Sequence, residues 1–172
     1  LKASLIYQLG ALAGFAGCAG GALGHVKPHG ALYNLAARDV EVAETVARAI
    51  ATLDATLILV TLPGSALADA GRAQGLHVAH EGFADRAYTV DGTLVPRSVP
   101  GAVIHDPERA ADRAVRMVTE GRVATLDGSM IPLEINTLCV HGDTPNAPQI
   151  ARRLRAALED AGVQISPLST AF

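Results

Sequence analysis

The sequence predicts an α/β fold in which parallel strands alternate with helices. The clearest observation is a stretch at residues 40–53 with apolar side chains at helical spacing, which leads into a continuous β-favouring run at residues 56–61. Such a run is typical of a strand that is buried on both faces, as the strands of a parallel sheet are. The alternation returns later in the chain, with no internal repeat or low-complexity linker. With 172 residues, 49% of them hydrophobic, the chain 1–172 is predicted to form a single domain.

Turn and cap residues mark the elements in the first half of the chain. The first helix is predicted to end in a Gly-rich run at 17–24, and Pro28 to end the strand that follows. Pro63-Gly64 predicts a turn, and Gly75 predicts the end of a later helix. The predicted elements, in order, are a helix at 5–15, a strand at 23–27, a helix at 40–53, a strand at 56–61, a helix at 65–74 and a strand at 77–81.

Two Asp-Gly pairs interrupt this order in the second half. Asp91-Gly92 and Asp127-Gly128 each lie between short β-favouring runs, which is the usual sign of a hairpin. Asp106 suits an N-cap, with Pro107 at the first helical position. The other predicted elements are a helix at 107–119, a strand at 135–140, a helix from the Thr144-Pro145 cap to 161, and a strand at 163–165. An open doubly wound sheet and part of a barrel both satisfy this pattern.

Composition excludes several classes of protein. The net charge of −3 comes from 14 basic and 17 acidic residues without a basic cluster, so we expect no nucleic-acid partner. Cys18 and Cys139 are far apart, which argues against a disulfide framework or a thiolate zinc site and favours the cytoplasm. The apolar stretch at 5–24 raises the alternative of a signal peptide. However, it contains Tyr7, Gln8 and many glycines, and its uninterrupted part is shorter than the roughly 20 residues of a membrane span, so we expect no membrane association.

Ionisable residues follow three of the predicted strands. Lys27 and His29 share a face after the first, Glu81 ends the third, and His141 and Asp143 share a face after the strand at 135–140. If these strands are adjacent and parallel, the side chains lie together at the carboxyl ends of the strands. There they can move protons, polarise a carbonyl or hold a divalent metal. The alternatives are a helix-capping role for Asp143 and ordinary hydrogen-bonded positions for the histidines.

Charged residues also surround Phe83 directly after the strand at 77–81. One interpretation is a surface loop with an Asp85–Arg86 pair that contributes little to stability. The other makes Arg86 a fork for a substrate carboxylate, with Arg97 as a second anion-binding candidate. No Walker-type loop and no G-x-G-x-x-G after a strand occurs, so local motifs predict no nucleotide site.

Several collinear segments resemble the LamB/YcsF family, which comprises the A subunits of bacterial 5-oxoprolinase. The resemblance covers nearly the whole chain. The most specific motifs are Lys-Pro-His-Gly and His-Gly-Asp-Thr-Pro. The segments that carry the resemblance are His25–Asn34, Phe83–Arg86 with Tyr88, Asp91-Gly92, Leu94-Val95 and Arg97, Pro100–Ile104, and Cys139–Pro145.

The resemblance implies a distorted TIM-like β/α barrel akin to the glycoside hydrolase/deacetylase superfamily. It also implies ATP-dependent opening of the lactam 5-oxoproline to glutamate, with ATP as co-substrate and the B and C subunits as partners. On this interpretation Lys27 or Arg86 holds the substrate carboxylate or a developing oxyanion, and Glu81, His141 or Asp143 moves protons. The same segments place His29 in the catalytic group, and Asn34 and Arg97 among the substrate-binding residues.

Two departures from the family pattern accompany the resemblance. Members begin with a further acidic, His-containing region that this sequence lacks, so we expect a barrel incomplete at the N-terminus. Asn146 stands where Gly is common. Two alternatives to this function are a metal-dependent carbohydrate deacetylase or hydrolase with His29, His141 and Asp143 as ligands, and a non-catalytic remnant or binding module. An incomplete barrel also has exposed strand edges, which would favour a homo-oligomer.

Overall fold

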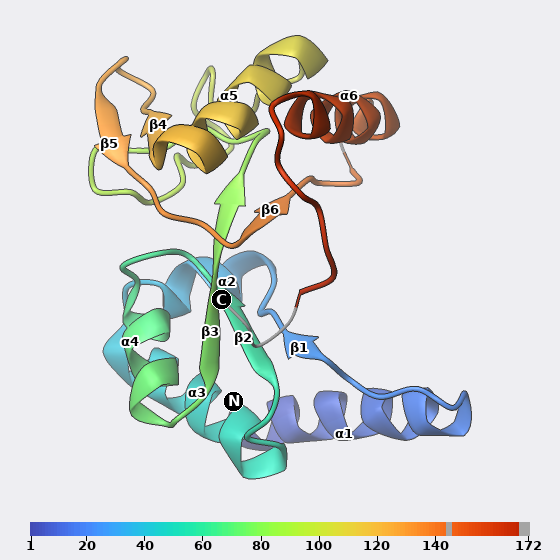
Figure 1. The fold of residues 1–172 in the computed structure, drawn as a ribbon. Helices are drawn as coiled ribbons and strands as arrows, with labels where there is room; N and C mark the ends of the chain where they lie inside the picture. Colours follow the sequence, from blue (N-terminus) through green and yellow to red (C-terminus); the bar gives the residue numbers. More distant parts are fainter. Residues whose placement is uncertain (144–145, 169–172) are drawn as a thin grey trace. The chain divides into compact units, whose positions relative to one another are not determined.

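The computed structural model describes residues 1–143 and 146–168 (Figure 1). The chain divides into two compact units, one formed by residues 1–80 with Leu168 and one formed by residues 81–167. The strand β3 (His77–Phe83) belongs to both, because its first four residues lie in the first unit and its last three in the second.

The first unit alternates helices with parallel strands. The strand β1 (His25–Val26) pairs with β2 (Ile58–Thr61), and β2 pairs with residues 77–80 of β3, both in parallel. The helices are α1 (Lys2–Cys18), α2 (Gly30–Ala36), α3 (Val40–Leu53) and α4 (Ala66–Ala73). The helix α2 was not among the sequence predictions.

Local signals explain where these helices begin. The Asp39 carboxylate accepts a hydrogen bond from the Val42 amide at 3.0 Å and caps α3, and the Ser65 hydroxyl accepts one from the Ala68 amide at 3.1 Å and caps α4. All four residues of β2 are buried, as predicted for a strand covered on both faces. Gly71 allows α4 to lie close to β2, because a Cβ at this position would be 2.6 Å from Cδ2 of Leu59.

The second unit contains α5 (Pro107–Glu120) and α6 (Ala147–Asp160), which pack against each other. Residues 81–83 of β3 pair in parallel with β6 (Thr137–Cys139), and β4 (Arg122–Ala124) forms the predicted hairpin with β5 (Met130–Pro132). The Asp106 carboxylate caps α5 by accepting hydrogen bonds from the Glu108 and Arg109 amides, with Pro107 at the first position, as predicted.

The pairing order β1-β2-β3-β6 confirms the predicted fold class of parallel strands alternating with helices. The order follows the chain without a reversal. These four strands contain no reversal of the kind that marks the switch point of a doubly wound sheet.

One predicted strand is wrong. Residues 163–165 form no strand, because none of the strands in residues 1–143 and 146–168 pairs with them. Gly162 has φ of +78° instead, the Val163 amide bonds to the Leu158 carbonyl at 2.9 Å, and Val163 packs on the core that α5 and α6 share. The predicted Thr144-Pro145 cap lies outside the described residues. Among the helices that the structure describes, none is both long and apolar enough to cross a membrane.

Candidate active site

The ends of β3 and β6 position the central pair of the site. Phe83 and Cys139 are Cα partners in the parallel register of these strands. Asp85 and His141 each follow two residues later, at the carboxyl ends where α/β proteins gather their functional groups. The register of two strands therefore brings together two residues that are 56 positions apart.

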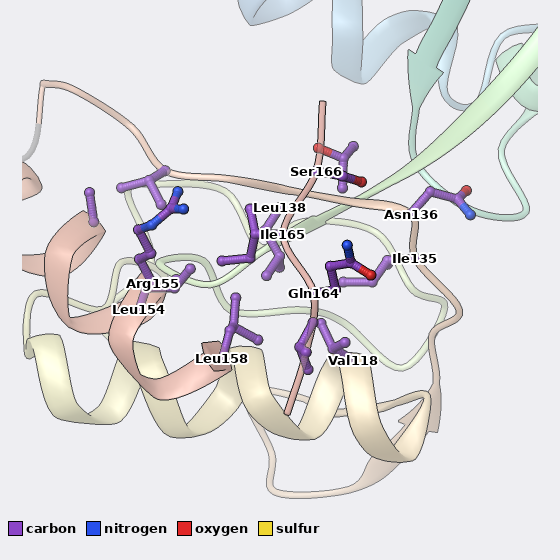
Figure 2. A pocket seen from close by; sticks show the side chains of 14 residues that line it. Val118, Ile135, Asn136, Leu138, Leu154, Arg155, Leu158, Gln164, Ile165 and Ser166 are labelled. Atoms are coloured by element: carbon purple, nitrogen blue, oxygen red, sulfur yellow. The ribbon is translucent and has the colours of Figure 1, made fainter. Parts of the chain in front are cut away.

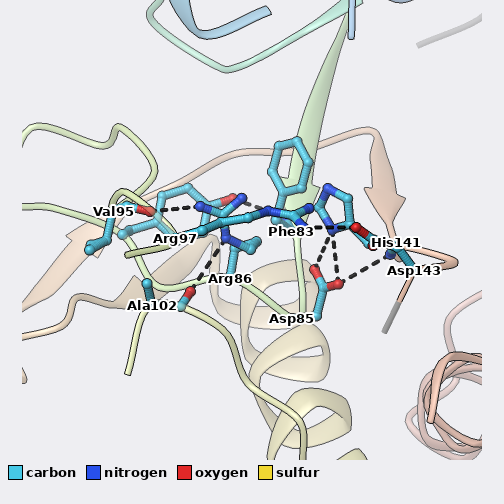
Figure 3. A network of polar contacts seen from close by, with 9 residues as sticks. Phe83, Asp85, Arg86, Val95, Arg97, Ala102, His141 and Asp143 are labelled. Atoms are coloured by element: carbon cyan, nitrogen blue, oxygen red, sulfur yellow. Dashed lines mark hydrogen bonds and ion pairs between the residues drawn. The ribbon is translucent and has the colours of Figure 1, made fainter. Parts of the chain in front are cut away.

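Asp85 holds His141 through three contacts (Figure 3). The His141 amide donates to Oδ2 of Asp85 at 3.1 Å. Nδ1 of the imidazole lies 3.1 Å from Oδ1 and 2.9 Å from Oδ2 of the same carboxylate. The side chain of Asp85 is 1% exposed and that of His141 is 24% exposed, so the carboxylate is inside the protein and the imidazole is partly open.

The electrostatics of the pair determine where the imidazole proton lies. Burial raises the pKa of Asp85, but the hydrogen bonds and the charge of His141 outweigh it and hold that pKa below its usual value. Because the carboxylate is ionised at neutral pH, Nδ1 carries a hydrogen and donates it to Asp85. In the neutral imidazole, Nε2 then carries the lone pair, and none of the described residues hydrogen-bonds to Nε2.

An aromatic ring packs against one face of the imidazole. The Phe83 ring stacks on His141 with centroids 5.6 Å apart and planes inclined by 17°. Phe83 is buried, and its amide donates to the Tyr88 hydroxyl at 2.9 Å. Burial raises the pKa of Tyr88 far above its usual value, so the phenol stays neutral. His141 is thus fixed at one edge by Asp85 and on one face by Phe83.

A second charge pair lies in the same network. Nη1 of Arg97 donates to Oδ2 of Asp143 at 2.8 Å, and the side chains are 49% and 65% exposed (Figure 3). The hydrogen bond from Arg97 lowers the pKa of Asp143, and the charge of His141 adds to this. Asp143 therefore stays ionised at neutral pH, which makes it a poor proton donor.

Arg86 is buried, and the charges of Arg97 and Asp143 both act on it. Its Nη2 donates to the Val95 carbonyl at 2.6 Å and its Nε to the Ala102 carbonyl at 3.4 Å. Burial lowers the pKa of Arg86, and the nearby charge of Arg97 adds to this. With 6% exposure, Arg86 holds the loop that carries Arg97 in place; its predicted role as a substrate fork stays a prediction.

Glu81 is buried within β3, opposite Thr137 of β6. It interacts electrostatically with Tyr88, whose pKa it raises. Its predicted role in proton transfer is an untested prediction.

The first unit holds the other predicted site residues. Lys27 follows β1, and its ammonium lies 5.6 Å from the centre of the Tyr33 ring, within reach of a cation–π interaction. His29 is exposed, with Nδ1 2.9 Å from the Lys27 carbonyl, and the Asn34 amide donates to the Gly30 carbonyl at 3.2 Å. The predicted roles of Lys27, His29 and Asn34 stay predictions.

Comparisons with known proteins place the chain in a family. The model of the LamB/YcsF family matches residues 1–172. The chain belongs to the LamB/YcsF family. It is 55% identical over 163 residues to a Symbiobacterium thermophilum protein named as the A subunit of 5-oxoprolinase, a match that covers 95% of this chain and 62% of that relative. A protein of the same name from Thermus thermophilus is 52% identical over 163 residues, covering 95% of this chain and 65% of the relative.

A solved structure agrees with this assignment. The crystal structure of a lactam utilization protein from Thermus thermophilus matches with a TM-score of 0.90 and 49% identity, over 97% of this chain and 66% of the other. The chain spans slightly less than two thirds of the length of the two curated relatives, at 62% and 65%.

The LamB/YcsF chain offers no preformed metal centre in the part that the structure describes, where no three His, Cys, Asp or Glu side chains are grouped as ligands would be. Asp143, one of the ligands in the deacetylase alternative, is paired with Arg97. His29 is another, and its Nδ1 lies 2.9 Å from the Lys27 carbonyl oxygen. The described residues therefore add no support to that alternative.

Sequence reasoning missed Asp85 as a site residue. One of its interpretations made Asp85 and Arg86 a surface pair, which is wrong because both are buried, at 0% and 6% exposure. A signal was available. Asp85 follows the predicted parallel strand at 77–81 closely, and it lies two residues beyond the observed end of β3, the same position that His141 has after β6.

Proposed function

We propose that this chain acts as the A subunit of a 5-oxoprolinase and takes part in the ATP-dependent hydrolysis of 5-oxo-L-proline to L-glutamate. The names of its relatives support the reaction, and their designation as one lettered subunit implies further subunits, which we take to be B and C. The observation that carries the proposal is the imidazole of His141, held by a buried carboxylate with its other nitrogen directed away from that carboxylate.

Lactam hydrolysis needs a group that takes a proton from the attacking water and gives one to the leaving nitrogen. His141 suits both steps. Nε2 accepts the water proton as the oxygen bonds to the lactam carbonyl carbon, and the imidazolium formed is stabilised by the ionised Asp85. Nε2 then returns the proton to the ring nitrogen as the C–N bond breaks, which leaves the amino group of glutamate.

Substrate binding calls for a cation, because 5-oxoproline carries a carboxylate. Arg97 is the exposed guanidinium of the network, and its planar fork has further N–H donors besides the Nη1 that contacts Asp143. We assign Arg97 to the substrate carboxylate, with Arg86 supporting its loop. Lys27, His29, Glu81 and Asn34 complete the proposed set of residues, and ATP is the proposed co-substrate.

The direct test is ATP-dependent release of glutamate from 5-oxoproline by this chain mixed with its B and C partners. We expect release only from the complete mixture with ATP. His141→Gln should lower the rate of release by roughly 10²–10⁴-fold, whereas His105→Gln, at an exposed histidine, should leave it unchanged. No release from the complete mixture, under conditions in which a full-length relative from the same family is active with the same partners, would overturn the proposal for this chain.

A further inference from the structure

A small pocket of about 120 Å³ lies between α5 and β4, and arginines dominate its lining. Its seven lining residues are Arg109, Asp112, Arg113, Arg116, Arg122, Val123 and Ala124. All belong to the unit formed by residues 81–167. None of them takes part in the proposed lactam chemistry.

The sequence explains why the arginines converge. Arg109, Arg113 and Arg116 are spaced by four and three residues, so they lie on one face of α5. Gly121 ends the helix with φ of +61°, a left-handed conformation that turns the chain, and Arg122 directly after it begins β4. Nη1 of Arg113 donates to the Ala124 carbonyl at 2.9 Å and so ties the helix to the strand.

The positive charge of the pocket is not balanced. Four arginines and Asp112 line it, which leaves a net charge of +3. Glu108, at the start of the same helix, is paired with Arg153. Within residues 1–143 and 146–168, no ion pair joins Arg109, Arg116 or Arg122 to an acidic side chain. Like charges at this helical spacing are destabilising unless an anion lies among them.

Arg113 supplies an independent observation. Its Nη1 and Nη2 donate to the Ala124 and Arg86 carbonyls at 2.9 and 3.0 Å, but its buried Nε has no hydrogen-bond partner. A buried donor without an acceptor is costly, and structures rarely retain one without a reason. Burial lowers the pKa of Arg113; Tyr88 opposes this shift, and the nearby charge of the Arg109 guanidinium adds to it.

We propose that this pocket binds a phosphate group, either inorganic phosphate or the terminal phosphate of a nucleotide. Guanidinium forks match the oxygens of a phosphate in geometry and charge. The volume of about 120 Å³ suits a tetrahedral oxyanion, and it is far below the roughly 300–1,000 Å³ of sites that enclose drug-sized ligands. Any nucleoside attached to the phosphate therefore lies outside the pocket.

Calorimetric titration at constant ionic strength tests the proposal with inorganic phosphate, tripolyphosphate and ATP as separate probes. The variant is Arg116→Ala/Arg122→Ala, which leaves the structural hydrogen bonds of Arg113 intact. The control is Arg152→Ala, an exposed arginine on α6 that does not line the pocket. We expect saturable binding that weakens by at least about tenfold in the double variant, the loss of roughly one charge-assisted contact, and not in the control.

The probes separate the sources of the phosphate. Binding of inorganic phosphate alone supports a free-anion site, and binding of tripolyphosphate and ATP but not of phosphate supports a nucleotide tail. A folded wild-type chain that binds none of the three overturns the proposal, as does binding that the double variant leaves unchanged. If the double variant weakens association with B and C while no phosphate probe binds, the arginines recognise carboxylates of a partner protein, and the phosphate assignment is wrong.

A second pocket, of about 480 Å³ near β6 and α6, has a mostly apolar lining that includes Leu138, Leu154 and Ile165 (Figure 2). No feature of the described part of the chain indicates what would occupy this pocket.

Discussion

Two acid–base pairs in residues 81–167 differ in one respect above all. Asp85 with His141, and Asp143 with Arg97, each join distant parts of the chain at almost the same distance, 2.9 and 2.8 Å. The side chains of the first pair are 1% and 24% exposed, whereas those of the second are 65% and 49% exposed. The two contacts are nearly equal in length, but the first pair is shielded from solvent and the second is open to it.

Burial decides what each pair does. A buried carboxylate that loses its partner retains the full cost of desolvation, whereas an exposed pair exchanges its partner for water and is screened by salt. The buried pair therefore fixes the orientation and tautomer of His141, and the exposed pair leaves Arg97 able to exchange Asp143 for another carboxylate. The first arrangement suits proton transfer, and the second suits substrate binding.

The largest effect is expected for His141→Gln. Glutamine keeps a polar side chain but cannot accept and return a proton, so kcat of the complete mixture should fall by roughly 10²–10⁴-fold, the usual contribution of general acid–base catalysis. Steady-state kinetics with saturating 5-oxoproline would measure this. Retention of more than a tenth of the activity would assign proton transfer to another residue.

Asp85→Asn should follow in size. The amide preserves the shape but removes the charge that stabilises the imidazolium, so we expect kcat to fall by at least about tenfold with little change in KM. A loss of about 1–3 kcal/mol in the free energy of unfolding is also expected, because buried polar groups lose their charged partner. The ¹⁵N shifts of the His141 ring would show whether Nδ1 still carries the hydrogen. Unchanged shifts and unchanged kcat together would contradict the positioning role.

The pH dependence of stability gives a smaller effect. Because the pKa of Asp85 in the folded state is below its ordinary value of 3.8, its stabilising contribution is present above that value and is lost as pH falls through the lower folded pKa. The melting temperatures of the wild type and Asp85→Asn should differ at neutral pH and converge below pH 3.8. A difference that persists undiminished at lower pH would show that the carboxylate charge is not its source.

Arg97→Ala should have the smallest effect on stability. The pair that it breaks is exposed, so the melting temperature should stay close to that of the wild type, even at low ionic strength. KM for 5-oxoproline should rise while kcat changes little, because the substrate carboxylate loses its cation. Arg152→Ala is the matched control. A fall in kcat with constant KM would move Arg97 from substrate binding to the chemical step.

Elements whose signals are local could be predicted from the amino-acid sequence. The helical spacing of residues 40–53 predicted α3 with its observed bounds, Asp106 and Pro107 predicted the start of α5, and Asp127-Gly128 predicted the hairpin of β4 and β5. The sequence also singled out His141, Asp143 and Arg97, which lie in the described network. A cap, a turn or a helical face depends on neighbours within a few positions, so these features could be inferred without coordinates.

Which charges lie inside the protein, and what they contact, depends on the three-dimensional fold. Asp85 and Arg86 are adjacent in sequence, yet one holds an imidazole 56 positions away and the other holds the carbonyls of Val95 and Ala102. The segment at 163–165 has β-favouring residues at both ends, yet no strand in the described part of the chain pairs with it. Strand register and loop burial depend on partners far along the chain, and a local pattern carries no information about which partner will be present.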